Sequence, residues 1–418
     1  MSVKRRDFIQ LSALAAGTGI ITGFSSFTSK KEDLRSLTDD VVPISIEERK
    51  ARIAKAQRLM MEQKIEALVM DAGTSMEYFT GISWGQSERP MVVVIPAKSE
   101  PRYICPGFEE SRLRERITLG KNVNAWQEDE SPYKIIANSI KDAGINAGNI
   151  AIEERLRFFI LDGIKNEAPH LNFVSGVPVT MLCRLIKSAA EIALMQKATD
   201  ITVAAIKFGI SQLREGMSQS ELSSIIDDAQ ANAGGASSFA LALFGESSAF
   251  PHGSNKPQKL KKGDIVLMDC GCIVKGYNSD ITRTVVFGAS PTKRQQEIWN
   301  LEHASQAAGF AVAKIGAACE QVDAAARKVI TDAGFGPGYK LPGLPHRTGH
   351  GIGMDGHEWG NIVKGNKQLL QPGMCFSVEP TISIPGEFGV RLEDCAYITT
   401  EGAKWFSQPA ISIDKPFG

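Results

Sequence analysis

The segment GDIVLMDCGCIVKGYNSDITRTVVFG, residues 263–288, decides the fold of this chain. It contains two apolar runs joined at Lys275-Gly276, which is the pattern of a β-hairpin. Two carboxylates, Asp269 and Asp280, lie within these apolar runs. An ionised carboxylate in an apolar strand is unfavourable unless a cation or a hydrogen-bond donor compensates for the lost water. The pair therefore predicts a shared positive charge, although a solvated sheet face or two separate salt bridges would also explain it.

The composition is that of an ordinary globular protein, and the length is sufficient for about two or three domains. The 418 residues carry 47 Lys+Arg and 47 Asp+Glu, so the formal net charge is zero. This balance favours neither a nucleic acid nor a strongly charged partner. The seven cysteines are an odd number without the spacing of a disulfide framework. We interpret Cys270 and Cys272 as small buried residues of a strand rather than as a zinc or redox site.

The N-terminus resembles an export signal. Residues 1–30 combine Arg5-Arg6, followed by Phe8-Ile9, with a mildly apolar stretch at 11–27, as in twin-arginine signals. This pattern predicts a periplasmic or extracellular protein that has no membrane contact after the signal is removed. A basic cytosolic N-terminus with a short apolar helix is the alternative. The polar residues 31–44 would then form a tether.

Two further regions follow. Residues 45–180 alternate strands and helices, which predicts an α/β domain: helices at 46–63, 133–143 and 156–166, and strands at 65–70, 91–95, 102–105, 149–152 and 172–174. Residues 181–418 predict helices at 189–213, from a capping box at 218–221, at 291–315 and at 320–333, with the hairpin between the pairs and strands at the end. Two helices followed by strands, occurring twice, suggest an internal duplication.

The second region also holds most of the chemistry. Its apolar segments carry Asp269, Asp280, His350, Glu379 before Pro380, and Glu393 within Gly-Val-Arg-Leu-Glu-Asp, and further histidines lie nearby. Four carboxylates and one imidazole suit a pair of divalent cations such as Mn²⁺, Fe²⁺, Co²⁺ or Zn²⁺. Each residue taken singly could be structural, and it is the ordered set that indicates a metal site.

In this order of ligands the chain resembles the methionine aminopeptidase, proline dipeptidase, aminopeptidase P and creatinase superfamily, over residues 45–405. Two Asp eleven residues apart, His in Gly-His-x-x-Gly, Glu before Pro and Glu in Gly-Val-Arg-x-Glu-Asp carry the resemblance, and Tyr78–Gly81, Arg184 and Lys187 agree with it. The N-terminal domain and the His-Arg-Thr-Gly-His-Gly pattern are similar to the Xaa-Pro peptidase branch. The resemblance implies an α/β (α+β) chain, with a creatinase-like domain at 45–180 and a pita-bread catalytic domain at 181–418.

The resemblance also implies roles. Asp269 would hold one cation, His350 and Glu379 the other, and Asp280 and Glu393 both; Mn²⁺ is expected, with Co²⁺, Zn²⁺ or Fe²⁺ as alternatives. A hydroxide between the cations would attack the scissile carbonyl, and Glu379 would carry the proton. The remaining catalytic candidates would be His252 and His357 at the tetrahedral intermediate and leaving group, His346 at the substrate end, and Arg391 orienting a bridging carboxylate or making a plain salt bridge. The expected activity is hydrolysis of Xaa-Pro bonds in dipeptides or at the N-termini of short peptides, by a homodimer.

Two departures from the family pattern lie near the expected substrate pocket. The usual Pro after His-Glu is missing, because Glu358 is followed by Trp359-Gly360-Asn361, and Thr381 replaces the usual Gly after Glu-Pro. We expect Trp359 to narrow the pocket. A metal-dependent hydrolase or lyase of a small non-peptide compound is therefore an alternative function. A non-catalytic binding module is a third, against which the intact ligand set argues.

Overall fold

The computed structural model describes residues 35–417. The predicted export signal at 1–30 lies outside the described residues, as do residues 31–34 of the predicted tether. The described part of the tether contacts the C-terminal half of the chain: the Leu37 amide donates to the Ala233 carbonyl at 2.9 Å, and Asp40 pairs with Lys197 at 2.8 Å. Within residues 35–417, none of the helices has the length and apolar composition needed to span a bilayer.

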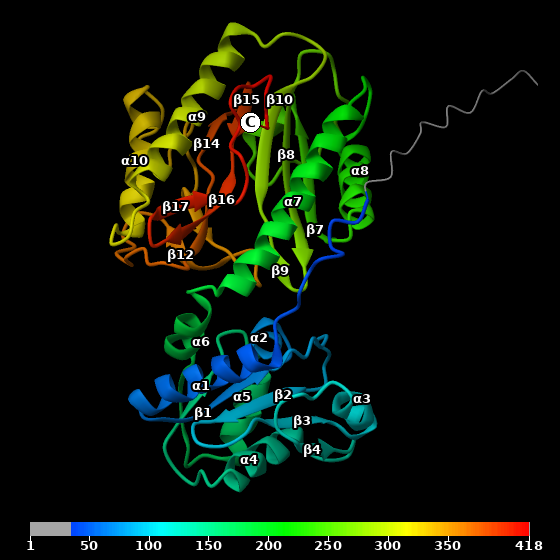
Figure 1. Cartoon of the computed structure of the whole chain (residues 1–418), viewed down its shortest axis with the longest axis vertical. Coiled ribbons are helices and arrows are strands. Elements are labelled where there is room, and N and C mark those ends of the chain that lie inside the picture. The colour runs from blue at the N-terminus through cyan, green and yellow to red at the C-terminus, as the bar shows by residue number, and fades with distance from the viewer. Residues whose placement is uncertain (1–34, 418) are drawn as a thin grey trace, which may run out of the picture. The chain divides into compact units, whose positions relative to one another are not determined.

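The N-terminal domain is a six-stranded mixed sheet with helices on both faces (Figure 1). Side chains of the central strand β1 (Ile65–Asp71) point alternately to the two faces of the sheet, so Leu68 and Met70 belong to one core cluster, and Ala67 and Val69 to the other. The first cluster is covered by α1 (Ile46–Glu62), α2 (Thr74–Thr80) and α6 (Val177–Arg184), and the second by α4 (Pro132–Asp142) and α5 (Phe158–Glu167). The strand order is β4 (Asn122–Trp126), β3 (Arg102–Pro106), β2 (Val92–Pro96), β1 (Ile65–Asp71), β5 (Asn149–Ile152) and β6 (Asn172–Ser175).

The predicted elements of this domain are confirmed within a few residues, but α2, α6, β4 and a short helix α3 (Glu110–Arg114) were not predicted. The strand β4, Asn-Val-Asn-Ala-Trp, is half-buried and polar enough to lack an apolar run. The predicted domain boundary at 180/181 falls inside α6, which ends at Arg184.

The C-terminal domain begins with α7 (Ala189–Ser211) and α8 (Gln219–Asn232), each opened by the capping box that its Ser-x-x-Glu pattern predicts. A three-stranded path β10-β8-β7 follows, from β7 (Ala236–Phe244), β8 (Ile265–Val274) and β10 (Ile281–Val286), with β9 (Tyr277–Asn278) also paired to β8. The predicted hairpin turn is present: Lys275 and Gly276 have φ of 48° and 87°, as a two-residue type I′ turn requires.

A second helix pair, α9 (Lys293–Val312) and α10 (Cys319–Asp332), precedes the remaining strands (Figure 1). The five-stranded order is β12 (Glu358–Ile362), β11 (Gly349–Gly351), β13 (Cys375–Val378), β16 (Asp394–Thr399) and β17 (Gly402–Trp405), and β14 (Thr381–Ile384) pairs with β15 (Phe388–Arg391). This order of two helix pairs, each followed by strands, agrees with the predicted duplication. All seven cysteines are free and buried.

Candidate metal centre

The two aspartates lie beside one another on neighbouring strands. Asp269 of β8 pairs in register with Thr282 of β10, and Asp280 directly precedes β10. The carboxylates are thus offset by two residues rather than directly opposed. A short antiparallel bridge joins Thr282 to Glu393, with backbone hydrogen bonds of 3.1 and 3.3 Å. This bridge connects the hairpin to the chain between β15 and β16, so it brings the third carboxylate to the first two.

The candidate histidine ligand, His350, lies in a strand where both neighbouring positions require glycine. His350 is the middle residue of β11, between β12 and β13. A Cβ at Gly349 would lie 2.0 Å from the Ser377 carbonyl oxygen, and one at Gly351 would lie 1.7 Å from that of Trp359. These contacts explain the Gly-His-Gly pattern, because the two flanking backbones approach too closely for any side chain.

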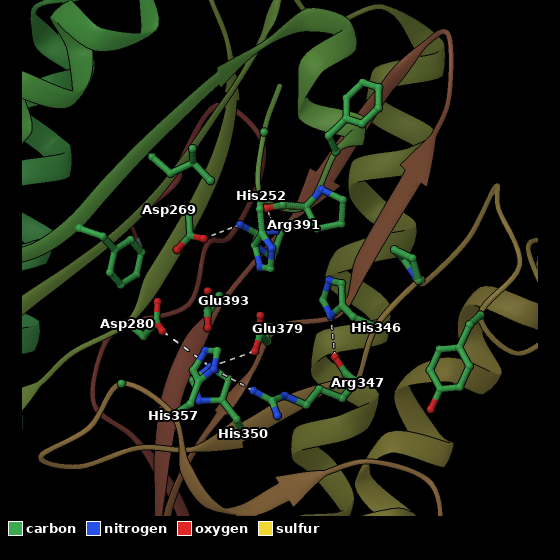
Figure 2. A pocket seen from close by; sticks show the side chains of 18 residues that line it. His252, Asp269, Asp280, His346, Arg347, His350, His357, Glu379, Arg391 and Glu393 are labelled. Carbon is green, nitrogen blue, oxygen red and sulfur yellow. Dashed lines mark hydrogen bonds and ion pairs between the residues drawn. The ribbon is translucent and has the colours of Figure 1, made fainter. Parts of the chain in front are cut away.

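The five predicted ligands converge from these separate segments (Figure 2). His350 Nε2 lies 3.1 Å from Glu379 Oε1 and 3.7 Å from Asp280 Oδ2. Ligand atoms of Asp269, Asp280 and Glu393 all lie within 4.8 Å of one another, and so do those of His350, Glu379 and Glu393. Glu393 belongs to both groups, so the five side chains form one continuous cluster of candidate ligands.

Unpaired oxygens show that this cluster fits a cation. Asp269 Oδ1, Asp280 Oδ1 and Glu393 Oε1 are buried and have no hydrogen-bond partner among the described residues. Burial and the neighbouring carboxylates Asp269 and Glu379 raise the pKa of Asp280 well above its usual range. Burial and the carboxylates Asp280 and Glu379 likewise raise the pKa of Glu393 well above its usual range. Both shifts favour the protonated carboxyl groups in the absence of a cation, and bound divalent ions would favour the ionised ones.

The ring of His350 supports the same conclusion. Its Nδ1 lies 3.0 Å from the carbonyl oxygen of Gly351, which can only accept, so Nδ1 carries the proton. Nε2 is then the nitrogen that can ligate, and it faces the Glu379 and Asp280 carboxylates. A metal ion between them would bind both the imidazole nitrogen and the carboxylate oxygens.

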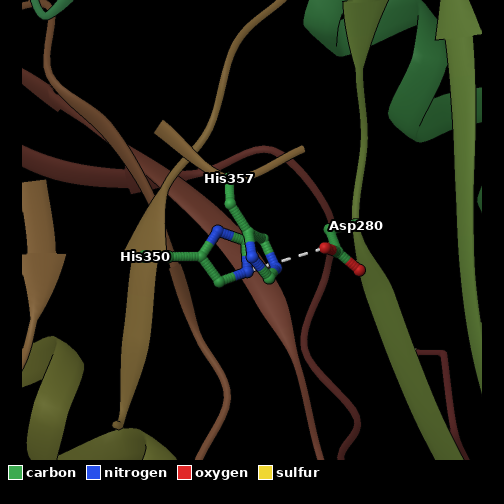
Figure 3. A group of neighbouring side chains, drawn as sticks. All are labelled: Asp280, His350 and His357. Carbon is green, nitrogen blue, oxygen red and sulfur yellow. Dashed lines mark ion pairs between the residues drawn. The ribbon is translucent and has the colours of Figure 1, made fainter. Parts of the chain in front are cut away.

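His357 is close enough to be considered a sixth ligand. Figure 3 shows its ring beside the ring of His350 and the carboxylate of Asp280, and the two imidazole centroids are 3.9 Å apart. Arg347 Nη2 lies 3.0 Å from His357 Nδ1 and can only donate, so neutral His357 carries its proton on Nε2. Burial, His350 and Arg347 lower the pKa of His357 to about 4, which keeps the ring neutral. With one nitrogen accepting from Arg347 and the other protonated, neutral His357 presents a hydrogen-bond donor beside the cluster, although its distance from Asp280 and His350 also suits a ligand.

A cavity of about 1170 Å³ opens onto the carboxylates (Figure 2). Its wall includes every predicted site residue: Asp269, Asp280, His252, His346, His350, His357, Glu379, Arg391 and Glu393, together with Arg347, Phe239, Leu241, Phe250 and Tyr339. The cavity therefore joins a charged floor to a largely apolar mouth.

These observations identify the family when set beside known proteins. Residues 193–400 match the profile of metallopeptidase family M24, and residues 52–186 match the creatinase/prolidase N-terminal domain. A Xaa-Pro dipeptidase of Lactobacillus delbrueckii subsp. lactis is 32% identical over 364 residues, which are 86% of this chain and 97% of that protein. The chain belongs to metallopeptidase family M24.

Solved structures agree with this assignment and place this M24 metallopeptidase in the Xaa-Pro peptidase branch. A prolidase from Thermococcus sibiricus has a TM-score of 0.79 at 32% identity, covering 86% of this chain and 96% of its own. A Xaa-Pro dipeptidase from Bacillus anthracis has a TM-score of 0.76 at 29% identity, covering 86% and 97%. The expected creatinase-like domain followed by a pita-bread domain is therefore confirmed.

One expectation about the pocket of this M24 peptidase is wrong. Trp359 does not line the main cavity but a second cavity of about 290 Å³, where its ring lies 5.4 Å from the guanidinium carbon of Arg184. The other departure, Thr381, does bear on the site. Its hydroxyl lies 3.0 Å from His346 Nε2, and His346 Nδ1 donates to the Arg347 carbonyl oxygen at 2.7 Å. Both nitrogens of His346 are thus engaged, and the ring serves as a fixed wall.

Several functional contacts were not predicted from the sequence. Arg391 forms a salt bridge with Asp269 and not with either of the carboxylates expected to hold both cations, and its Nε donates to Thr282 at 3.1 Å. The Thr282 hydroxyl donates in turn to Glu393 Oε2 at 2.8 Å, and Ser377 donates to Glu379 Oε1 at 3.1 Å. The alternation of β10 was the one available signal, because it places Thr282 on the same side as Asp280. Nothing in the sequence indicated Ser377 or the contact from Arg347 to His357.

Proposed function

We propose that this M24 metallopeptidase hydrolyses the Xaa-Pro bond of dipeptides, or of short peptides at their N-termini, with two divalent cations. The observation that carries the proposal is the pair of ligand groups sharing Glu393 on the floor of one cavity. Asp269, Asp280 and Glu393 would hold one cation, and His350, Glu379 and Glu393 the other, with Asp280 close to both. Bound there, the cations would activate water and polarise the scissile carbonyl. The Xaa-Pro relatives supply the substrate class.

The protein's own residues perform the remaining steps. Burial would raise the pKa of Glu379, but His350 and His346 outweigh it and bring that pKa to about 2. Glu379 is therefore ionised at neutral pH and accepts the proton of the attacking water, then passes it to the leaving nitrogen. Neutral His357 donates from Nε2 to the oxygen on which charge develops. Arg391 holds the Asp269 carboxylate in place, and its pKa is raised by the surrounding carboxylates despite burial.

The apolar mouth fits a small uncharged side chain and a proline ring. Phe239, Leu241, Phe250 and Tyr339 line it, and His252 lines the same cavity as the carboxylates. We place the substrate amino end and its proline between these groups, with the scissile bond above the shared Glu393.

The remaining features of the proposal are Mn²⁺ as the preferred metal, a homodimeric assembly, and export through the twin-arginine signal. Twin-arginine export carries folded proteins, which suits a peptidase that takes up its metal before leaving the cytoplasm. The all-buried, unpaired cysteines are compatible with that route.

The test is hydrolysis of Ala-Pro, Ala-Pro-Ala, Ala-Ala and Met-Ala by Mn²⁺-loaded protein, with an EDTA-treated sample and Asp280→Ala as controls. Cleavage of the Xaa-Pro peptides alone, lost in both controls, is expected; the ratio of Ala-Pro to Ala-Pro-Ala turnover separates a dipeptidase from an aminopeptidase. Metal bound at about two ions per chain without cleavage of any peptide would refute the peptidase and favour the small-molecule hydrolase or lyase.

A further inference from the structure

His357 occupies a position with little packing to hold it. Its ring lies in the wall between the main cavity and the second cavity of about 290 Å³, and it lines both. Its neighbours there are His350 and the Arg347 guanidinium. Neither contact restrains the backbone of residue 357. The place of the ring therefore depends on the segment Gly353–Glu358, which we call the His357 loop.

Both ends of the His357 loop are anchored to other elements. Near its start, the Asn278 side chain donates to the Met354 carbonyl at 2.8 Å and the Asn278 amide to the Gly353 carbonyl at 2.8 Å, just ahead of Asp280. At its end, the Glu358 side chain is 2% exposed and pairs with Arg184 and, at 3.0 Å, with Lys187. A Cβ at Gly353 would lie 2.8 Å from Glu358 Oε2 and from Lys187 Cε, so the turn fits tightly around this ion pair.

The middle of the loop is held by one carboxylate. Asp355 Oδ1 accepts from Thr74 Oγ1 and from Arg155 Nη1, both at 2.7 Å, and Oδ2 pairs with Arg184 Nη2 at 2.6 Å. Thr74 opens α2 and Arg155 follows β5, so both belong to the N-terminal domain. The Asp355 amide also donates to Glu358 Oε1 at 3.1 Å. Asp355 is thus one point at which the N-terminal domain holds the loop that carries His357, beside Met354, which packs on that domain's core, and Glu358, which pairs with Arg184 of α6.

We infer that Asp355 is a positioning residue through which Thr74 and Arg155 of the N-terminal domain hold His357 in place for the reaction. The N-terminal domain then contributes to turnover without touching the reacting atoms. Hydrogen bonds to a charged group are the strong ones, and three of them converge on a single carboxylate two residues from His357. The kinetic part of this inference rests on the proposed peptidase function, and its structural part does not.

The mild variants Arg155→Met and Thr74→Val test the inference, because Arg155 is half-exposed and Thr74→Val keeps the shape of the side chain. Asp355→Asn is the stronger change. Arg89→Met is the matched control, since it removes an ion pair with Glu128 in the same domain away from the loop. Hydrogen exchange of residues 349–362, bound Mn²⁺ and steady-state kinetics on Ala-Pro are measured for each, with Arg155→Lys as the conservative rescue.

We expect Arg155→Met to raise amide exchange in 353–358 by about threefold or more, with exchange in 263–288 and bound Mn²⁺ unchanged. kcat should fall about tenfold while KM changes less than about twofold, because His357 acts in the transition state. Arg155→Lys should restore most of both. Unchanged exchange of the loop in Arg155→Met and Asp355→Asn, or an equal loss in Arg89→Met, would overturn the inference. A wild-type protein that cleaves no peptide would refute only the proposed function. The exchange measurement would still test whether Thr74 and Arg155 restrain the His357 loop through Asp355.

Discussion

Replacing Thr282 by Val should weaken metal binding through one hydroxyl group. Thr282 is fully buried, and its hydroxyl donates to Glu393 Oε2 at 2.8 Å while it accepts from Arg391 Nε at 3.1 Å. The other oxygen of Glu393 has no partner among the described residues. Val has nearly the same shape, so the substitution leaves the packing intact. It removes the hydrogen bond that directs the one carboxylate common to both ligand groups.

The size of the effect follows from that lost contact. A hydrogen bond to a charged group contributes about 1.5–3 kcal/mol, which corresponds to about 10–100-fold in an equilibrium constant. Loss of a group that orients a metal ligand typically costs a similar 10–100-fold in affinity or activity. We therefore expect the Mn²⁺ dissociation constant of Thr282→Val to rise by about 10–100-fold, with activity partly restored at saturating metal.

The assay is a competition titration of Mn²⁺ against a fluorescent chelator, followed by Ala-Pro hydrolysis at saturating metal. The control is Thr80→Val, which also loses a buried hydroxyl that donates once, to the Met76 carbonyl, and accepts once, from the Ile82 amide, but lies in the N-terminal domain. The control should lose stability without losing affinity for Mn²⁺. A Thr282→Val protein that binds Mn²⁺ within about twofold of wild type would refute the role given to this hydroxyl.

Three further predictions concern export and the pH dependence of stability. Because burial and neighbouring carboxylates raise the pKa values of Asp280 and Glu393, the metal-free folded protein keeps protons that the unfolded chain releases. Its stability should therefore fall as pH rises above about 4 toward those raised values, and saturating Mn²⁺ should remove the decline; a metal-free unfolding midpoint independent of pH would contradict this. Burial raises the pKa of Glu358, but Lys187 and Arg184 outweigh it and lower that pKa from 4.5 to about 2. Its stabilisation is thus present above 4.5 and lost as pH falls through about 2, so Glu358→Gln should lower the free energy of unfolding at neutral pH by about 3–5 kcal/mol and flatten its acid dependence, as urea titrations would show. Finally, replacing Arg5-Arg6 by Lys-Lys should retain the protein in the cytoplasm of its host, which cell fractionation measures, and normal export of that variant would refute the twin-arginine proposal.

Local sequence patterns predicted much of the fold. The helices α7 and α8 begin at the capping boxes that Ser188–Glu191 and Ser218–Glu221 predict, and the hairpin turns at Lys275-Gly276. Elements without a strong pattern were missed. The strand β7 carries an apolar run at 239–244, but its first four residues are exposed and mostly small, and α2 is only seven residues long. Periodicity reports burial along one element, and it fails where burial is partial or the element is short.

The candidate site divides in the same way. The identity of all five ligand candidates came from the chain, because a carboxylate or imidazole within an apolar strand stands out against its neighbours. Their grouping came from the fold: the bridge between Thr282 and Glu393, 111 residues apart in the chain, brings the carboxylates together. The same holds for Arg155 and Thr74, which reach Asp355 across 200 and 281 residues. Residue types and their local spacing specify the chemistry that a segment can offer, whereas contacts between distant side chains exist only after the core has packed and fixed the distances between elements.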